Sequence, residues 1–244
     1  MSGNETRHGR VAGKRVLITG AARGMGRSHA VRLAETARLV EKHSRRAITH
    51  VVDVRDTAAL AAAVDDGVAQ LGGLDAAVAN AGVLTVGTWD KTTQKQWRTV
   101  LDVNLIGTWN TCAAALPHLV ERGGSLVNIS STAGLKGTPL QLPYTASKHG
   151  VVGLSRALAN ELAAQNVRVN TVHPTGVETG MRPDSLHGLL GEGRPDLVPI
   201  FLNALPTVMA EAIDISNAVL FLVSDESRYV TGLEFKVDAG VTLR

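Results

Sequence analysis

A glycine-rich turn near the start of the chain restricts the fold more than any other feature. The apolar stretch at residues 15–19 is followed by Gly20, Gly24 and Gly26, after which a helical pattern begins. Glycines at this spacing let the backbone approach a pyrophosphate closely, and the beginning of a helix favours the negative charge of a phosphate. A strand that leads through such a turn into a helix predicts an open α/β sheet with a nucleotide-binding cleft.

Short apolar strands alternate with longer helical patterns along the rest of the sequence. Nearly continuous apolar strands are typical of a parallel sheet that helices cover on both faces. The predicted strands are residues 15–19, 48–52, 76–79, 125–129, 168–172 and 233–237, and the predicted helices include residues 57–71, 94–120 and 144–164. The sequence therefore predicts a doubly wound, parallel, Rossmann-type α/β fold with three layers.

The chain has the length and composition of one compact domain. Its 244 residues are 44% hydrophobic and 19% charged, which is enough to bury a large core. We predict a flexible polar leader at residues 1–12 and a single domain at residues 13–244. Residues 180–210 are rich in Gly, Pro and Leu and exceed the length of an ordinary connection, so we expect a lid or substrate loop there.

Two side chains with matched acid–base properties stand four residues apart at the start of a predicted helix. Tyr144 and Lys148 face the same way because residues at i and i+4 share one helix face. A lysine cation beside a phenol lowers the phenol's pKa from about 10 towards neutrality, which makes the phenol a usable general acid and base. Ser131 precedes them in the chain. Together with the glycine turn, this set indicates hydride-transfer chemistry.

From about residue 13 to residue 240 the chain resembles the short-chain dehydrogenase/reductase family. Several motifs in the family's order carry this resemblance. They are the glycine turn, Asp53-Val54, Asn80-Ala81-Gly82, Asn104, Ser130-Ser131, Tyr144-x3-Lys148 and the stretch from Pro174 to Thr179. The longer runs at residues 20–24, 131–137 and 148–154 are similar to the carveol-dehydrogenase-like branch of that family, which is often described as mycofactocin-coupled.

The resemblance implies a role for each of four catalytic positions. Tyr144 would exchange a proton with the substrate oxygen while a nicotinamide ring takes or gives hydride. Lys148 would bind the nicotinamide ribose and, together with the positive ring of the cofactor, depress the pKa of the phenol. Ser131 would donate a hydrogen bond to the substrate oxygen, and Asn104 would hold a water that links Lys148 to solvent.

The resemblance also implies a nicotinamide dinucleotide site. Asp53 would meet the adenine, and Val177 and Thr179 would meet the carboxamide. The full predicted set is Gly20, Arg23, Gly24, Met25, Gly26, Asp53, Val54, Asn80, Ala81, Gly82, Tyr144, Lys148, Pro174, Val177 and Thr179. NAD is the expected cofactor on the branch resemblance alone, and NADP stays open as the alternative.

The region between residues 26 and 48 departs from the family pattern. A second strand belongs there, followed by a charged residue that selects between a ribose hydroxyl and a 2′-phosphate. Residues 27–46 taken as one helix would be about 30 Å long, which exceeds the usual crossover. Residues 34–37 look like a junction between two helices. We hypothesise that a segment is missing near this junction, and an intact mass of 25.6 kDa would contradict the hypothesis.

The predicted substrate loop is strongly apolar. It contributes Met181, Leu186, Leu189, Leu190, Leu197, Val198, Ile200, Phe201 and Leu202. These side chains suit an apolar secondary alcohol or ketone of terpenoid character, but they could equally close onto the protein's own core. Two other functions stay open. One is reduction of a 3-oxoacyl thioester, and the other is a dinucleotide-binding scaffold or sensor without turnover.

Charge, cysteine count and hydropathy argue against several other classes. The net charge is +3, and the basic residues are interspersed with acidic ones along the chain, which argues against a nucleic-acid surface. Cys112 is the only cysteine, so no internal disulfide forms, and no apolar run reaches the ~18 residues that span a bilayer. No histidine has a partner at metal-ligand spacing, so no metal is expected. We predict a cytoplasmic protein with a small-molecule substrate and, by family analogy, a homotetramer.

Overall fold

Five parallel strands form a single sheet in the order β1-β2-β3-β4-β5. The structure is a computed structural model, and it describes residues 10–38, 46–179, 181, 188 and 193–243. The strands are β1 (Val16–Ile18), β2 (Ala76–Ala79), β3 (Gly124–Ile129), β4 (Val167–Pro174) and β5 (Glu234–Val237).

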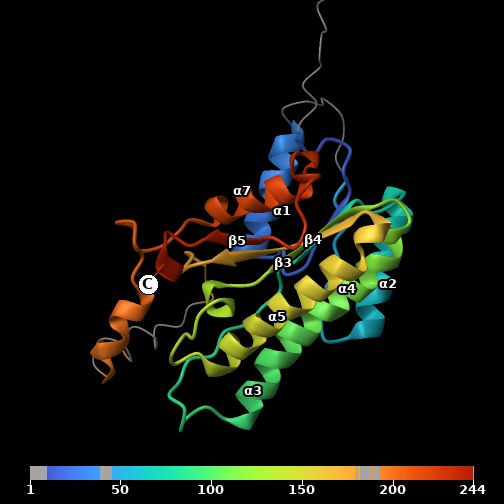
Figure 1. Cartoon of the computed structure of the whole chain (residues 1–244). Coiled ribbons are helices and arrows are strands. Elements are labelled where there is room, and N and C mark those ends of the chain that lie inside the picture. Colours follow the sequence, from blue (N-terminus) through green and yellow to red (C-terminus); the bar gives the residue numbers. More distant parts are fainter. Residues whose placement is uncertain (1–9, 39–45, 180, 182–187, 189–192, 244) are drawn as a thin grey trace, which may run out of the picture.

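Helices cover both faces of this sheet (Figure 1). Helices α1 and α7 lie on one face, and α2, α4 and α5 lie on the other. The helices are α1 (Gly24–Arg38), α2 (Thr57–Leu71), α3 (Gln94–Leu101), α4 (Gly107–Val120), α5 (Leu142–Glu161) and α7 (Ala212–Val223). The predicted doubly wound fold with three layers is confirmed.

The two cores take alternate residues from the same strands. Ala76 and Val78 of β2 pack in the core beneath α1 and α7, whereas Ala77 packs in the core beneath α4 and α5. All three side chains are completely buried. Burial on both faces explains why the strands are nearly continuous apolar runs in the sequence.

Local capping sets the ends of α2 where the sequence pattern placed them. The Asp56 carboxylate accepts a hydrogen bond from the Ala59 backbone N–H at 3.0 Å, which satisfies one free donor of the first turn. Gly72 then ends the helix with a left-handed φ of 79°, a conformation that costs glycine little.

The helix predicted at residues 94–120 is interrupted. A π-helical turn, η1 (Asp102–Ile106), separates α3 from α4. A π-turn inserts one residue into the helix and is often found at functional sites. Here it carries Asn104, whose side chain is completely buried.

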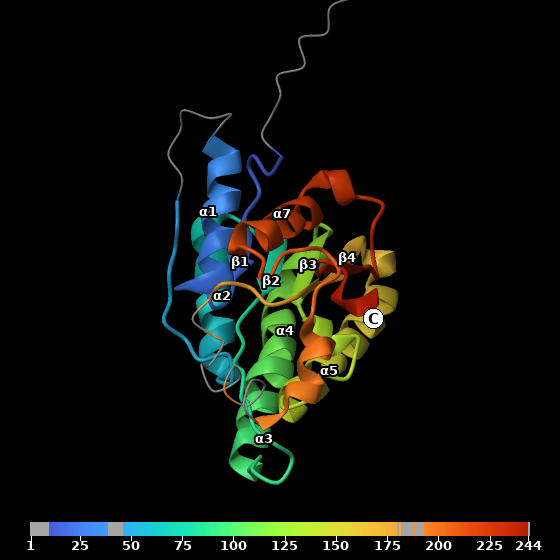
Figure 2. The same cartoon turned by 90° about the vertical axis from the view of Figure 1, so that its left-hand side faces the viewer.

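The strand predicted at residues 48–52 is wrong. Residues 46–53 are extended, but they pair with no strand in the described part of the chain, and Val51 is fully exposed. The stretch is held against α2 instead, where His50 Nε2 lies 3.0 Å from an oxygen of Asp66. Figure 2 shows it as an isolated trace at the side of the molecule. A strand forms only when its backbone groups find a partner, and none of the described strands lies beyond β1.

The predicted junction at residues 34–37 leaves no break in the helix. Helix α1 continues without interruption to Arg38, and residues 39–45 lie outside the described part of the chain. In the described part of the connection from β1 to the next paired strand, there are therefore two helices and no strand.

The packed part of the molecule begins inside the predicted leader. Val11 is 4% exposed and belongs to the core beneath α1 and α7. Arg10 forms an ion pair with Glu226 at 2.6 Å. Residues 1–9 lie outside the described part. None of the described helices is both long enough and apolar enough to cross a bilayer.

A buried histidine connects helices α1 and α7, which cover the same face of the sheet. His29 is completely buried, and its Nδ1 lies 2.8 Å from the Ser216 hydroxyl of α7. Its Nε2 has no hydrogen-bond partner among the described residues. Burial lowers the pKa of His29 from 6.5 to about 4, because the charged imidazolium would lose its hydration.

We expect this histidine to make folding stability depend on pH. Below its unfolded pKa the unfolded chain binds a proton that folded His29 excludes, so stability is full above pH 6.5 and falls as the pH drops towards 4. Urea unfolding at about pH 7 and about pH 5 should differ by about 2 kcal/mol from this group. His29→Gln should remove that part of the difference, and an unchanged pH dependence in the variant would contradict the assignment.

Candidate active site

The predicted site residues come together at the carboxyl ends of the strands. Two neighbouring cavities open there, one beside β1 and β2 and the other beside β3 and β4. Both cavities are lined by Met25, Leu84, Thr179 and Met181, so they are continuous. Ligands of open α/β sheets bind in the crevice outside the carboxyl ends of the strands.

The glycine turn forms a cradle that side chains would fill. Gly20 and Gly24 have left-handed φ values of 67° and 56°. A Cβ placed on Gly26 would stand 2.5 Å from Asn80 Nδ2 and would also strike the Gly20 carbonyl oxygen. The turn therefore keeps its backbone N–H groups open at the beginning of α1, as a pyrophosphate requires.

Asn80 ties this turn to the end of β2. Its side-chain nitrogen donates to the Thr19 carbonyl oxygen at 3.0 Å, and its backbone N–H donates to the Thr19 hydroxyl at 3.1 Å. The side-chain oxygen of Asn80 is buried and has no partner among the described residues. A buried oxygen without a hydrogen-bond partner, next to the open glycine turn, is what we expect in a cleft that binds a polar ligand. The residues at this end fit a dinucleotide.

The cleft beside β1 contains ten of the residues predicted to bind the cofactor. They are Gly20, Arg23, Gly24, Met25, Asp53, Val54, Asn80, Ala81, Gly82 and Thr179. The Asp53 carboxylate is paired with Arg55 at 2.5 Å, and hydrogen bonds from Arg55 lower the pKa of Asp53 to about 2. Asp53 therefore lines the cleft as a carboxylate that already has a partner.

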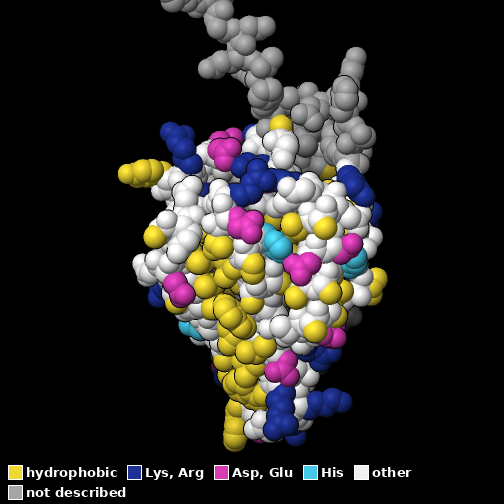
Figure 3. Space-filling view, turned by 90° about the vertical axis from the view of Figure 1, so that its right-hand side faces the viewer, with side chains coloured by type: hydrophobic (Ala, Val, Ile, Leu, Met, Phe, Trp, Pro, Cys, Tyr) yellow, Lys and Arg dark blue, Asp and Glu magenta, His cyan; other side chains and the backbone are white. Residues whose placement is uncertain are grey.

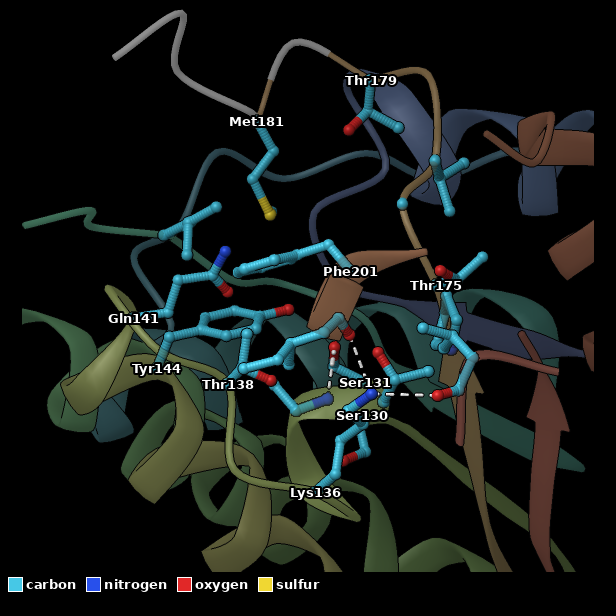
Figure 4. Close-up of a pocket in the computed structure, with 18 of the residues that line it drawn as sticks. Ser130, Ser131, Lys136, Thr138, Gln141, Tyr144, Thr175, Thr179, Met181 and Phe201 are labelled. Atoms are coloured by element: carbon cyan, nitrogen blue, oxygen red, sulfur yellow. Dashed lines mark hydrogen bonds between the residues drawn. The ribbon is translucent and has the colours of Figure 1, made fainter. Parts of the chain in front are cut away.

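Tyr144, Ser131 and Lys148 converge at the second cavity, beside β3. Tyr144 and Ser131 line it, and the Ser131 hydroxyl lies near enough to the phenol to affect its pKa. Lys148 is 4% exposed and lies behind them, with its Nζ 5.5 Å from the centre of the Tyr144 ring. That ammonium donates to the Ile129 carbonyl oxygen at 2.8 Å, at the end of β3. Figure 4 shows the Tyr144 hydroxyl pointing into the cavity near Ser131.

The pKa of Tyr144 does not follow the sequence prediction. Enclosure in the cavity raises the pKa of the phenol above 10, and the hydrogen bond with Ser131 opposes this only in part. Burial also lowers the pKa of Lys148 from 10.5 to about 8. The expected lowering by Lys148 is absent here because desolvation disfavours both charged groups. Without a ligand, Tyr144 is therefore a protonated phenol at neutral pH.

The Asn104 side chain braces two segments beside the site, and its predicted water link stays a prediction. Its side-chain oxygen accepts from the Val83 backbone N–H at 2.8 Å, and its nitrogen donates to the Val83 carbonyl oxygen at 2.9 Å. The same nitrogen donates to the Ser147 hydroxyl at 3.1 Å. Both amide hydrogens are used, so the side chain cannot also donate to a water. It holds the loop after β2 against α5.

His173 positions Ser131, and the sequence did not point to this role. Its Nδ1 lies 2.9 Å from the Ser131 carbonyl oxygen, and its Nε2 lies 2.7 Å from the Thr171 hydroxyl. The first contact requires a proton on Nδ1, which leaves Nε2 to accept from Thr171. Burial lowers the pKa of His173, which keeps the ring neutral. Only the pairing of β3 with β4 brings these residues together.

Lys136 joins two walls of the same cavity. Its ammonium donates to the Ile200 and Val241 carbonyl oxygens, each at 2.9 Å (Figure 4). Ile200 lies in η5 (Pro195–Phe201), inside the predicted substrate loop, and Val241 begins η7 (Val241–Leu243) at the carboxyl end of the chain. No spacing in the sequence indicated that these three segments meet.

In the described part of the predicted substrate loop, some side chains line the cavity and others pack against the rest of the protein. Met181, Ile200 and Phe201 line the cavity, whereas Leu197 and Val198 pack against Leu140. Leu202 is half exposed. Leu186, Leu189 and Leu190 lie outside the described residues.

The remaining predicted residues lie in or beside these cavities. Pro174 and Val177 line the second cavity, and Gly26 lies in the cradle behind the first. Among the described residues, no group of histidine, cysteine or acidic side chains could hold a metal ion. Burial raises the pKa of the Cys112 thiol to about 12, so it is a poor nucleophile.

Comparison with known proteins gives strong matches over nearly the whole chain. A family model described as Enoyl-(Acyl carrier protein) reductase matches residues 12–242. The (-)-trans-carveol dehydrogenase of Rhodococcus erythropolis is 44% identical over 277 positions, covering 96% of this chain and 99% of the relative. That alignment is longer than the 244 residues of this chain, so the relative carries residues that the chain lacks.

Two solved structures match the fold closely. A short chain dehydrogenase from Mycobacterium paratuberculosis, bound to NAD, is 43% identical with a TM-score of 0.89, over 97% of this chain and 100% of that one. A carveol dehydrogenase from Mycobacterium avium in complex with NAD is 46% identical with a TM-score of 0.87, with the same coverage. The family model, the sequence relatives and the structures agree, and the chain belongs to the short-chain dehydrogenase/reductase family of oxidoreductases.

Proposed function

We propose that this protein transfers hydride between NAD and an apolar secondary alcohol or ketone of the carveol type. The observation that carries the proposal is the Tyr144 phenol, which lines the substrate cavity together with Ser131, and this cavity is continuous with the dinucleotide cleft. The likeness to carveol dehydrogenases and to NAD-bound relatives supports the choice of cofactor and substrate class.

Each side chain has a role that its surroundings support. A bound NAD supplies a nicotinamide ring that accepts or returns hydride at the reacting carbon. Tyr144 gives its proton to the ketone oxygen, or takes it from the alcohol, as the general acid and base. Ser131 donates a hydrogen bond to the same oxygen as charge develops on it. Lys148 supplies the buried cation that steadies the phenolate during alcohol oxidation.

The cofactor roles follow from the glycine cradle and the cavity that it borders. The backbone N–H groups at Gly24, Met25 and Gly26 would hold the pyrophosphate at the beginning of α1. Val177 and Thr179 line the second cavity, and Thr179 also lines the first. The nicotinamide carboxamide would bind beside these two residues. NAD is proposed in place of NADP because the two solved mycobacterial relatives contain NAD.

The size of the substrate cavity supports a single ring. Its volume is about 150 Å³, close to the size of an engineered cavity that holds benzene. Leu84, Ile200 and Phe201 supply apolar wall. A monocyclic alcohol fits this space, whereas the long chain of an acyl thioester would have to leave through the open side.

A direct assay separates the proposed reaction from the open alternatives. NADH formation should follow addition of carveol and related cyclic alcohols, and 3-oxoacyl thioesters should be reduced far more slowly. Faster turnover of the thioester would favour that alternative. Tight binding of NAD without turnover of either class would favour a scaffold or sensor.

Native mass spectrometry tests the shortened region and the cofactor together. A chain heavier than 25.6 kDa would support a missing segment near α1. NAD that stays bound through purification would support a tightly held cofactor of the kind expected for a mycofactocin-coupled enzyme. We also propose a cytoplasmic location, which fits a chain whose single cysteine is buried and free.

We further propose that the protein assembles as a homotetramer. Ile106 and Trp109 lie one turn apart on η1 and α4, and they are 47% and 43% exposed. Val120 and Leu142 are also exposed on α4 and α5. Figure 3 shows an apolar stripe on the face that carries these helices. Large apolar side chains of this kind are typical of an interface between subunits.

Trp109→Glu should therefore weaken the assembly. A buried Trp contributes roughly 150–250 Å² of contact area, and a carboxylate in its place would be desolvated without a partner. Sedimentation should show a tetramer for the native protein and smaller species for the variant. Trp89→Glu is the control, because Trp89 is 82% exposed and lies outside these helices. A monomeric native protein at working concentration would defeat the proposal.

A further inference from the structure

The side chain of Gln141 is buried in the substrate cavity without a partner. Gln141 is 8% exposed and lines the cavity three residues before Tyr144. Its amide makes no hydrogen bond to any residue in the described part of the chain. Figure 4 shows this amide on the same side of the cavity as the Tyr144 ring, directed into the open space.

Helix initiation does not explain this residue. Gln141 stands at the N-cap position of α5, but its side chain forms no capping hydrogen bond. Only its backbone carbonyl oxygen takes part in the helix, by accepting from the Thr145 N–H at 2.8 Å. Ser, Thr, Asp and Asn are the residues that cap helices well. A glutamine here neither caps the helix nor finds a partner in the protein.

Other polar groups of the cavity already have protein partners. Lys136 donates to two wall carbonyl oxygens. The Ser130 hydroxyl donates to the Lys148 carbonyl oxygen at 3.1 Å, and the Thr175 hydroxyl donates to the side chain of Asn203 at 3.1 Å. The Gln141 amide, by contrast, faces the cavity with no hydrogen-bond partner among the described residues.

We propose that Gln141 binds a second oxygen of the substrate, at a ring position remote from the carbon that reacts with Tyr144. The inference rests on the proposed function, and among the cyclic ketones and alcohols of that class it favours those with a second hydroxyl or carbonyl group over carveol itself, which has one oxygen. An amide offers two donors and one acceptor oxygen, so it can bind either group. A substrate without the second oxygen leaves the amide unpaired and is bound less well.

Two ketones of nearly the same shape test this subsite. We would measure the binding of 4-hydroxycyclohexanone and 4-methylcyclohexanone to the full-length protein by calorimetry with saturating NAD, and their reduction with NADH. The native protein should bind the hydroxyketone about tenfold more tightly, as expected for a buried amide that gains its partner. Gln141→Leu should bring this ratio to about one.

The control is Gln94→Leu, the same chemical change on the exposed first turn of α3. It should keep the native ratio. Gln141→Met provides a second variant of similar length in case the leucine variant does not fold. Equal binding of both ketones by the native protein, or an unchanged ratio in folded Gln141 variants, would overturn the proposal.

The test also separates this inference from the proposed function. Preferential binding that depends on Gln141, without reduction of either ketone, would support the subsite and count against the dehydrogenase. Reduction of both ketones with equal binding would support the dehydrogenase and overturn the subsite.

Discussion

Tyr144→Phe should lower kcat/KM by about 10²–10⁴, which is the usual contribution of a positioned general acid or base. The substitution removes only the phenol oxygen, so the ring keeps its place on α5 at the cavity wall. Hydride transfer then has no group to donate a proton to the developing alkoxide. Steady-state kinetics with a cyclic ketone and NADH measure the loss.

The chain offers a matched control, because Tyr229 is its other tyrosine and is almost fully exposed. Tyr229→Phe should leave kcat/KM unchanged. NAD binding, followed by fluorescence titration, should be the same in both variants and in the native protein. Retention of more than about one tenth of the native activity in Tyr144→Phe would rule out the proposed acid–base role.

The pKa of Tyr144 also predicts how the two directions of the reaction depend on pH. Because enclosure raises this pKa, the phenol is protonated near neutral pH and is ready to donate to a ketone. Alcohol oxidation instead needs the phenolate, so its rate should rise as the pH increases. Ketone reduction should show the opposite trend. In Tyr144→Phe the residual rates should lose both dependences.

Gly26→Ala should damage the cofactor cradle more than any other small substitution in it. The new methyl group would stand 2.5 Å from Asn80 Nδ2, and it would also meet the backbone of Gly20. Relief requires the turn to open, which moves the N–H groups that face the pyrophosphate. Loss of two hydrogen bonds to a charged group corresponds to a roughly 100-fold or greater weakening of NAD binding.

The same substitution should also lower the free energy of unfolding. Overpacking of a tight site costs about 1–3 kcal/mol, while alanine in place of helical glycine returns about 1 kcal/mol. Gly67→Ala is the control, since a Cβ at Gly67 in α2 meets nothing within 4 Å. It should stabilise the protein and leave NAD binding unchanged. Fluorescence titration and urea unfolding would check both variants, and native NAD affinity in Gly26→Ala would contradict the cradle.

The sequence was most informative where one local rule controls the structure. The capped and periodic stretch of α2 was predicted to the residue, because Asp56 and Gly72 mark its ends through contacts within one or two turns. The strand pattern also succeeded, since burial on both faces demands continuous apolar residues. It failed at residues 48–52, where an apolar stretch lacks a partner strand. Apolar residues favour pairing, but only a neighbouring strand provides it.

In the candidate site, too, the sequence predicted the features that depend on local spacing and missed those that depend on contacts between distant segments. The spacing of Tyr144 and Lys148 was sufficient to place them together on α5, and the glycine turn was sufficient to predict the cradle. In the protein without a cofactor the pKa of Tyr144 is raised and not lowered, because the enclosure that raises it comes from segments distant in the chain. Asn104 was recognised from its motif, but its bonds to Val83 and Ser147 were not.

The sequence by itself determined the fold class and the glycine turn, because these depend on periodicity and on short spacings along one chain segment. Its resemblance to the family pointed to the side chains that are proposed as catalytic. Only the tertiary structure decided that β1 is the outermost of the described strands on its side of the sheet and that His173 positions Ser131. It alone decided that Gln141 faces the cavity unpaired. Contacts between distant segments depend on strand order and side-chain packing, and neither leaves a regular spacing in the sequence.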